Sequence, residues 1–197
     1  VNLSYYAGNK QGKVTTDALG EAQIELIGEA PSDSYGLYNY RYISVTANLP
    51  EVGHIQANTG LIVFGSKVYL TGEAQAKGNT FDLKARLRHV DINGMKDDAN
   101  FQMDEFIKGP VVNGAVKGQL WEEVWKKTEA GERYDFINKK VEKIYDYQRS
   151  ERLIEEFSIQ TGPDGYATYK GRIDPDKNYF VTLTAVDGEG RESRAKL

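Results

Sequence analysis

The sequence predicts an all-β chain of two tandem antiparallel β-sandwiches, the first of them incomplete. Three observations predict this class. Period-2 alternation of apolar and polar residues, bounded by turn residues, is the commonest pattern along the chain. The 197 residues include 20 Gly and 13 Tyr but only 2 Met, a composition that favours β structure. Finally, one strand and turn arrangement occurs twice.

The individual strands follow from this alternation and from the turns between them. Asp and Gly in the turns supply side-chain caps and positive φ angles. The turns fall at 17–20, 91–94, 163–165 and 187–190. The clearest strands are 1–6, 22–27, 40–46, 60–64, 81–87, 167–173 and 179–186. Short strands joined by such turns are typical of antiparallel sheets.

The repeated arrangement indicates two related domains. TTDALGEA, which contains Thr16, is echoed at identical spacing by QTGPDGYA, which contains Thr161. YISVTA, ending at Ala47, is echoed by FVTLTA, ending at Ala185, and a further Ala follows each copy ten residues later. The copies lie 145 and 138 residues apart, too far for a solenoid repeat of about 20 to 50 residues. We predict immunoglobulin-like domains at 1–66 and 67–197.

The first domain is expected to lack its opening strands. If residues 1–6 correspond to 116–121, then residues 67–115 of the second copy have no counterpart in the first. A sandwich without these strands has an unpaired edge and a half-covered core. The chain also begins at Val1 without Met or a leader, and we expect it to be a fragment of a larger exported protein.

A long charged segment, about 121–157, admits two interpretations. Ile137, Val141, Ile144 and Tyr145 have the spacing of an amphipathic helix. A β-hairpin, in which residues 121–127 pair with a strand ending at 155–159, instead preserves the duplicated sandwich plan. We predict the hairpin.

Composition and spacing point away from catalysis. The formal net charge is −4, with no basic segment that would attract nucleic acid. No run approaches the ~20 apolar residues of a membrane span. The chain has no Cys, and its two histidines, His54 and His89, lie far apart. Asp174, Asp176 and Asn178 open like a calcium loop, but that loop's Gly and final Glu are missing. We predict no catalytic, cofactor-binding or metal-binding residue, and a protein that is not an enzyme.

Aromatic residues are the candidates for contact with a partner. Tyr38, Tyr40 and Tyr42 alternate and would form a stripe on one face of a strand. Cross-strand aromatic packing explains this stripe as readily as binding does. Trp121 and Trp125 also share one face if extended, and they lie on the predicted hairpin.

Several of these segments together resemble the macroglobulin-type domains of bacterial α2-macroglobulin-like proteins. The resemblance covers most of the chain, although each motif is weak by itself. It is carried by GPVVNGAVKGQLWEEVW (109–125), EEFSIQTGPDGYATYKG (155–171) and NYFVTLTAVDGEGRESRA (178–195), and by VTTDALGEAQIEL and YRYISVTA in the first half.

The resemblance implies a non-catalytic scaffold within a cell-envelope or secreted protein that entraps proteases. The partners would be neighbouring macroglobulin domains and, through the full-length protein, proteases. The thioester found in this family needs a Cys, which this chain lacks. Two alternatives remain open: an Ig-like module pair of a bacterial surface adhesin or stalk, and a carbohydrate-binding accessory module. The basic residues of the hairpin could also form a protease bait, but its apolar residues are expected to be packed.

Overall fold

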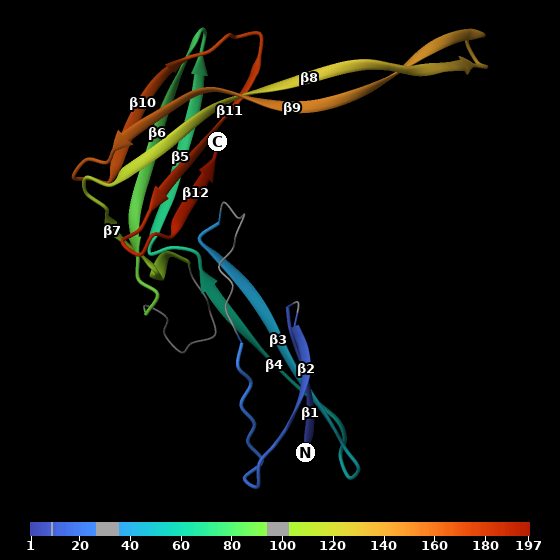
Figure 1. Cartoon of the computed structure of the whole chain (residues 1–197), viewed down its shortest axis with the longest axis vertical. Helices are drawn as coiled ribbons and strands as arrows, with labels where there is room; N and C mark the ends of the chain where they lie inside the picture. Colours follow the sequence, from blue (N-terminus) through green and yellow to red (C-terminus); the bar gives the residue numbers. More distant parts are fainter. Residues whose placement is uncertain (9, 27–35, 94–102) are drawn as a thin grey trace. The chain divides into compact units, whose positions relative to one another are not determined.

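The structure is a computed structural model that describes residues 1–8, 10–26, 36–93 and 103–197. It confirms the predicted all-β class, with several antiparallel sheets and one 3-10 turn, η1 (Met103–Glu105). The chain divides into two compact units, Val1–Lys67 (unit 1) and Val68–Leu197 (unit 2) (Figure 1). Each unit is described by itself.

Unit 1 forms a single four-stranded antiparallel sheet in the order β2-β1-β3-β4. Its strands are β1 (Asn2–Ala7), β2 (Lys10–Thr15), β3 (Tyr38–Leu49) and β4 (Gly53–Phe64). No second sheet occurs among its described residues. Their only fully buried hydrophobic side chains are Ala7 and Leu37. The described residues of unit 1 therefore form a single layer.

Unit 2 is a complete β-sandwich of two four-stranded sheets. In the smaller sheet, β10-β6-β5, strand β7 also pairs with β6; the larger sheet has the order β12-β11-β8-β9. The strands are β5 (Val68–Lys77), β6 (Thr80–Val90), β7 (Ile107–Pro110), β8 (Ala115–Asp135), β9 (Lys140–Gln160), β10 (Tyr166–Arg172), β11 (Asn178–Val186) and β12 (Glu192–Lys196).

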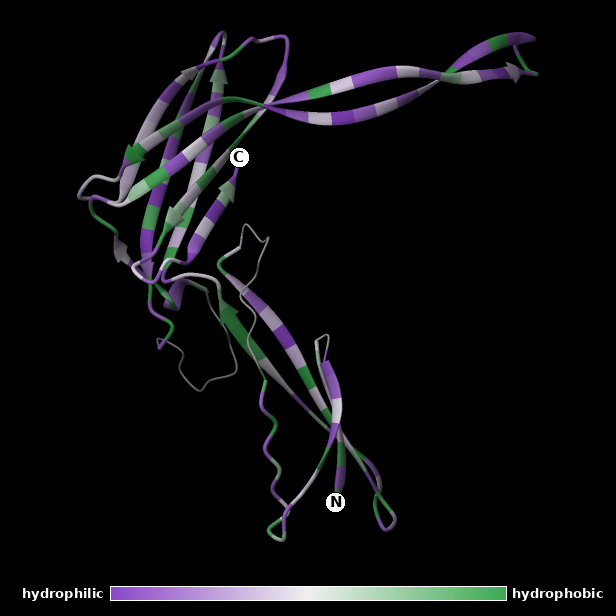
Figure 2. Cartoon of the chain, viewed as in Figure 1, coloured by the Kyte–Doolittle hydropathy of each residue, from purple (hydrophilic) through white to green (hydrophobic). Residues whose placement is uncertain are grey.

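The core of unit 2 lies between its two sheets. Alternate residues of β5 and β6, such as Leu70 and Leu83, meet alternate residues of β8 and β11, such as Val116 and Leu183. All four are at most 2% exposed. Each buried Val or Leu contributes roughly 1.5–3 kcal/mol. Figure 2 shows the pattern that produces this core: hydrophobic and hydrophilic residues alternate along the sandwich strands.

The larger sheet of unit 2 repeats the sheet of unit 1 strand for strand. Read from the opposite edge, its order β9-β8-β11-β12 matches β2-β1-β3-β4. Tyr5 pairs with Gly12 on one side and Val45 on the other. Gly118 likewise pairs with Phe157 and Leu183. The correspondence expected between 1–6 and 116–121 is wrong by two residues, because this register aligns Leu3 with Val116.

The repeated sequence motifs form the same hydrogen bonds in both units. The Val1 nitrogen donates to Thr16 Oγ1 at 2.7 Å, and the Gly114 nitrogen donates to Thr161 Oγ1 at 2.9 Å. Each Thr is followed by a turn that ends on a glycine with positive φ, 84° at Gly20 and 76° at Gly165. That φ region is open to glycine at no steric cost, which explains why the motif keeps a Gly there.

Most predicted strands are present, and one is wrong. Residues 22–26 are in no strand, while residue 27 lies outside the described part of the chain. Their counterparts in unit 2 belong to β10, which pairs with β6, and no equivalent of β6 occurs among the described residues of unit 1. Without a neighbouring strand, an extended segment does not form the ladder of backbone hydrogen bonds that makes a sheet. The turn predicted at 91–94 is present at 92–93, and residue 94 is outside the description.

The predicted hairpin is confirmed, and the helical alternative is wrong. Strands β8 and β9 pair continuously from Ala115 with Gln160 to Asp135 with Lys140, apart from two irregularities. Beyond the sandwich, they continue as a two-stranded ribbon (Figure 1). The alternation of Tyr145 and Tyr147 along β9 is the local signal for a strand rather than a helix.

Candidate interaction surface

The ribbon of unit 2 is an addition to the duplicated plan. Two residues separate Ala7 from Lys10 in unit 1, whereas 34 residues separate their counterparts, Leu120 and Glu155. None of these 34 residues belongs to the core of unit 2. Because a segment unnecessary for the core is free to serve recognition, the ribbon is the strongest candidate for a functional surface.

One face of the ribbon carries a row of large side chains. Cross-strand pairing places Trp121 opposite Leu153, Trp125 opposite Arg149, and Lys127 opposite Tyr147. Alternate residues of a strand share a face, so Tyr145 lies on this face too. We call Trp121, Trp125, Tyr145, Tyr147 and Leu153 the ribbon aromatic face.

Trp121 anchors this face to the sandwich. Its ring stacks on Phe180 with centroids 6.2 Å apart and planes 6° apart. Its Nε1 donates to Thr182 Oγ1 at 3.2 Å, and Lys196 Nζ lies 4.0 Å from the Phe180 ring centroid on the same face. The partner contact predicted for Trp121 is untested, but its ring is already packed within unit 2.

Trp125 is more open to a partner. Its side chain is 52% exposed, and its Nε1 donates to Glu123 Oε1 at 3.0 Å. Arg149 forms ion pairs with Glu123 at 3.0 Å and Glu151 at 3.1 Å. The carboxylate that holds the Trp125 indole is therefore itself paired with Arg149, and the indole is held in place without being covered.

Further along the ribbon, Lys127 lies between two tyrosines. Its Nζ is 3.7 Å from the Tyr145 ring centroid and 5.9 Å from that of Tyr147. Tyr147 is 58% exposed. Tryptophan and tyrosine are among the residues that dominate the contact energy of protein interfaces.

The end of the ribbon is apolar and exposed, contrary to expectation. Phe136 is 83% and Ile137 is 91% exposed, and Tyr134 meets Phe136 edge-on with centroids 5.0 Å apart. The apolar residues predicted to be packed here have no second sheet beside them, because the ribbon extends beyond the sandwich (Figure 1).

The predicted tyrosine stripe lies on β3 of unit 1, so the Tyr and Trp candidates belong to different units. Tyr38 packs against Phe64 with centroids 6.2 Å apart. The Tyr40 ring lies over Gly60, where an added Cβ would overlap it. Tyr40 and Tyr42 are 57% and 44% exposed. Packing thus explains Tyr38 and part of Tyr40, while the binding role of the stripe stays a prediction.

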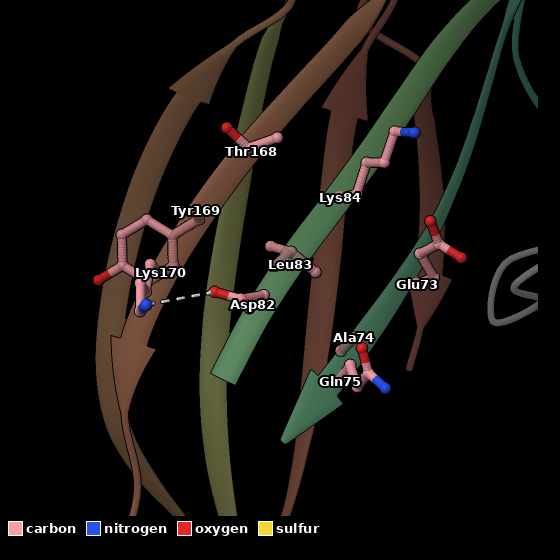
Figure 3. A pocket seen from close by; sticks show the side chains of 9 residues that line it. All are labelled: Glu73, Ala74, Gln75, Asp82, Leu83, Lys84, Thr168, Tyr169 and Lys170. Carbon is pink, nitrogen blue, oxygen red and sulfur yellow. Dashed lines mark ion pairs between the residues drawn. The ribbon is translucent and has the colours of Figure 1, made fainter. Parts of the chain in front are cut away.

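A shallow open depression lies on the outer face of the smaller sheet of unit 2 (Figure 3). Figure 3 shows Asp82 and Lys170 pointing toward each other, with Nζ and Oδ1 3.8 Å apart. Lys77 donates a hydrogen bond to Asp82 at 3.0 Å and, with the nearby Lys170, lowers the pKa of this carboxyl. Because Asp82 is paired and its acidity is increased, it suits an ion pair better than general base catalysis.

A second polar cluster joins the two sheets of unit 2. The rings of Phe157 and Tyr169 stack with centroids 3.9 Å apart. The Tyr169 hydroxyl donates to Glu155 Oε1 at 2.6 Å. This hydrogen bond, with some burial, raises the pKa of Tyr169 to about 12. The cluster is a structural tie between β9 and β10.

Glu122 forms the junction between the ribbon and the sandwich. Its carboxylate accepts a hydrogen bond from Arg152 at 2.6 Å and lies 3.6 Å from Lys177 Nζ. The Arg152 hydrogen bond is the main reason why the pKa of Glu122 is lowered. These contacts tie the base of the ribbon to the residue just before β11.

Within the described residues, no group of three or more His, Asp or Glu side chains is placed to hold a metal ion. No described helix is long and apolar enough to cross a membrane. The sequence reading missed Tyr145, Tyr147, Lys127 and Arg149 as members of one face with Trp125. Placing the ribbon turn at residues 136–139 would have supplied the register that joins them.

Comparison with known proteins gives only distant similarity. No family model and no curated protein matches the chain. Two crystal structures of Salmonella α2-macroglobulin are similar, one of the protein reacted with methylamine and one of a mutant. Their sequence identities are 6% and 8%, each with a TM-score of 0.49. The alignments cover this whole chain and 14% of each macroglobulin chain.

Proposed function

We propose that this chain is a non-catalytic scaffold segment of an α2-macroglobulin-like, protease-entrapping protein of the cell envelope. Its role is to hold neighbouring domains in register and to present the ribbon to them. The macroglobulin-type motifs in the sequence support this assignment, as does the duplicated sheet that those motifs build.

The observation that carries the proposal is the repetition of one four-stranded sheet with the same register, Tyr5 with Gly12 and Gly118 with Phe157. Separate domains of one chain move relative to one another unless their interface is large, and rigid-body rotation of domains is one way in which a conformational change is passed on. The ribbon aromatic face adds a surface of the composition that such contacts use.

A carbohydrate-binding role is the second candidate. Trp125 and Tyr147 are exposed on one face, and aromatic faces of this kind could stack on sugar rings. The protein-partner reading is favoured because Lys127 occupies the space near the Tyr145 ring and because Glu123 and Arg149 neutralise each other.

Protease trapping is tested on the longer protein that contains these units. The protein is incubated with a protease, and cleavage of a large protein substrate and of a small chromogenic peptide is then measured. Entrapment predicts loss of cleavage of the large substrate with cleavage of the peptide retained, because a cage excludes only the large substrate. Unchanged cleavage of both, or equal loss of both, contradicts it.

The present 197-residue chain is the control and is expected to inhibit neither reaction. A glycan panel probed with the same chain tests the second candidate. Binding that is lost in Trp125→Ala and kept in Val112→Ala, an exposed residue outside the ribbon, favours the carbohydrate role.

A further inference from the structure

The sheet of unit 1 has an apolar face that its counterpart in unit 2 buries completely. Leu3, Val45 and Ala47 correspond in register to Val116, Leu183 and Ala185. The three unit 2 residues are at most 1% exposed. The three unit 1 residues are only partly buried. Ile55 and Ala57, on the same face of β4, are exposed.

Unit 2 shows what covers such a face. The smaller sheet, made mainly of the hairpin β5–β6 with β10 beside it, packs over Val116, Leu183 and Ala185. In unit 1 the counterpart of β10 begins at Glu21, because Ala22 stands where Ala167 stands after the shared turn. Residues 22–26 are in no strand. The strand that should pair with them is not among the described residues.

The charges of this segment indicate the chemistry of the missing strand. In β10, the outward residues Tyr166, Thr168 and Lys170 pair with Arg86, Lys84 and Asp82 of β6. If residues 21–26 paired as β10 does, Glu21, Gln23 and Glu25 would take the outward positions and Ala22, Ile24 and Leu26 the inward ones. A strand opposite two glutamates is stabilised by cations at the facing positions.

We propose that the apolar face of unit 1 binds an amphipathic β-hairpin of the β5–β6 type. One of its strands pairs with residues 21–26, with apolar residues turned inward and Lys or Arg turned outward opposite Glu21 and Glu25. This is β-strand addition: backbone hydrogen bonds supply the pairing, and the alternating side chains supply the specificity. Binding completes the half-sandwich and covers its partly exposed apolar residues.

A peptide with the sequence of residues 68–90 of this chain serves as the probe, in two forms. The unaltered peptide places Asp82 opposite Glu25, whereas the Asp82→Lys peptide places a cation there; both keep Arg86 opposite Glu21. Binding to the full chain is measured by fluorescence anisotropy, and protection of residues 21–26 by hydrogen exchange. The Asp82→Lys peptide is expected to bind about threefold to tenfold more tightly.

Variants of the chain locate the site. Glu25→Lys should reverse the preference between the two peptides. Val45→Asn, on the apolar face, should abolish binding, whereas Thr46→Asn, on the opposite face of the same strand, should not. Circular dichroism confirms that each variant is folded.

Three results would overturn the proposal. The first is the absence of binding by the Asp82→Lys peptide to a folded chain. The second is a peptide preference that Glu25→Lys does not change. The third is a chain that is dimeric and becomes monomeric in Val45→Asn, since a second copy would then occupy the face.

Discussion

At the scale of single residues, the duplicated sheet of each unit has a glycine that leaves room for an aromatic ring on the neighbouring strand. An added Cβ on Gly118 would overlap the Phe157 ring, and one on Gly12 would overlap the Tyr5 ring. Glycine and aromatic residue have exchanged strands between the two units, since Tyr5 corresponds to Gly118. In both units a glycine leaves room for the aromatic ring on the neighbouring strand. Because the two residues have exchanged strands, the sequences of the two units differ here although their strand registers agree.

Gly118→Ala is expected to destabilise unit 2 by about 1–3 kcal/mol, because the new methyl group displaces the ring stacked between Gly118 and Tyr169. Gly109→Ala is the matched control: its Cβ would meet nothing within 4 Å, and its cost should stay below about 0.5 kcal/mol. Urea unfolding measures both. Equal stability of the two variants would contradict the packing argument.

Thr161 is buried, whereas its counterpart in unit 1, Thr16, is only partly buried. Its Oγ1 accepts a hydrogen bond from the Gly114 nitrogen and donates one to the Val111 carbonyl at 2.5 Å. Thr161→Val leaves those backbone groups without their partner and should cost about 1–3 kcal/mol. Thr16→Val removes the equivalent exposed contact and should change the unfolding midpoint far less. The reverse order would refute this assignment.

Tyr169 predicts a specific loss of stability at alkaline pH. Its folded-state pKa, about 12, lies above the ordinary 10.0 because its hydroxyl donates to Glu155. The unfolded chain therefore ionises first, so the stabilisation is complete below about pH 10 and is lost as pH rises toward 12. In Tyr169→Phe, the free energy of unfolding should fall less steeply across this window. Parallel curves for variant and parent would show that the hydrogen bond is not coupled to folding.

At the scale of elements, the two tryptophans of the ribbon differ in packing, although the sequence predicts the same role for both. Trp121→Ala removes a ring stacked on Phe180 and a hydrogen bond to Thr182 and should destabilise unit 2 by about 1–3 kcal/mol. Trp125→Ala exposes little new surface and should change stability by less than about 0.5 kcal/mol. Thermal unfolding of the two variants measures both losses of stability. A larger loss in Trp125→Ala than in Trp121→Ala would contradict the assignment of Trp121 as the packed ring.

Shortening the ribbon tests whether it is an addition to the fold. Replacing residues 124–150 with an Asn-Gly turn keeps Trp121, Glu122 and Glu151 and removes no residue of the core. The variant should keep its β-sheet circular dichroism and a cooperative transition, because a two-stranded ribbon contributes little stability of its own. Loss of cooperative unfolding would instead make the ribbon part of the folding unit.

The strands predicted from alternation are present wherever a partner strand lies beside them, whereas β2, β5 and β12 were not predicted. Phe81–Leu87 and Tyr179–Val186 lie within β6 and β11, because alternate residues of both segments face one core. Residues 22–26 alternate equally well, yet are in no strand, since alternation reports the face of a strand and not the presence of its neighbour. The ribbon aromatic face was only half predicted, because joining Trp125 to Tyr147 requires the position of a turn 136–139 that alternation alone does not locate.

At the scale of the whole molecule, the two units differ in what covers their sheets. Unit 2 has a continuous core. All but two of the buried hydrophobic side chains among the described residues lie in unit 2. Residues 68–197 alone should therefore unfold cooperatively with the midpoint they show in the full chain. Failure of this fragment to fold would mean that unit 1 contributes to its core.

The central claim is that both units contain the same sheet in the same register. Cross-strand nuclear Overhauser effects between backbone protons measure this register directly. The structure predicts that Tyr5 lies opposite Gly12 and Val45, and that Gly118 lies opposite Phe157 and Leu183. A register displaced by one or more residues in either unit would contradict the duplicated plan.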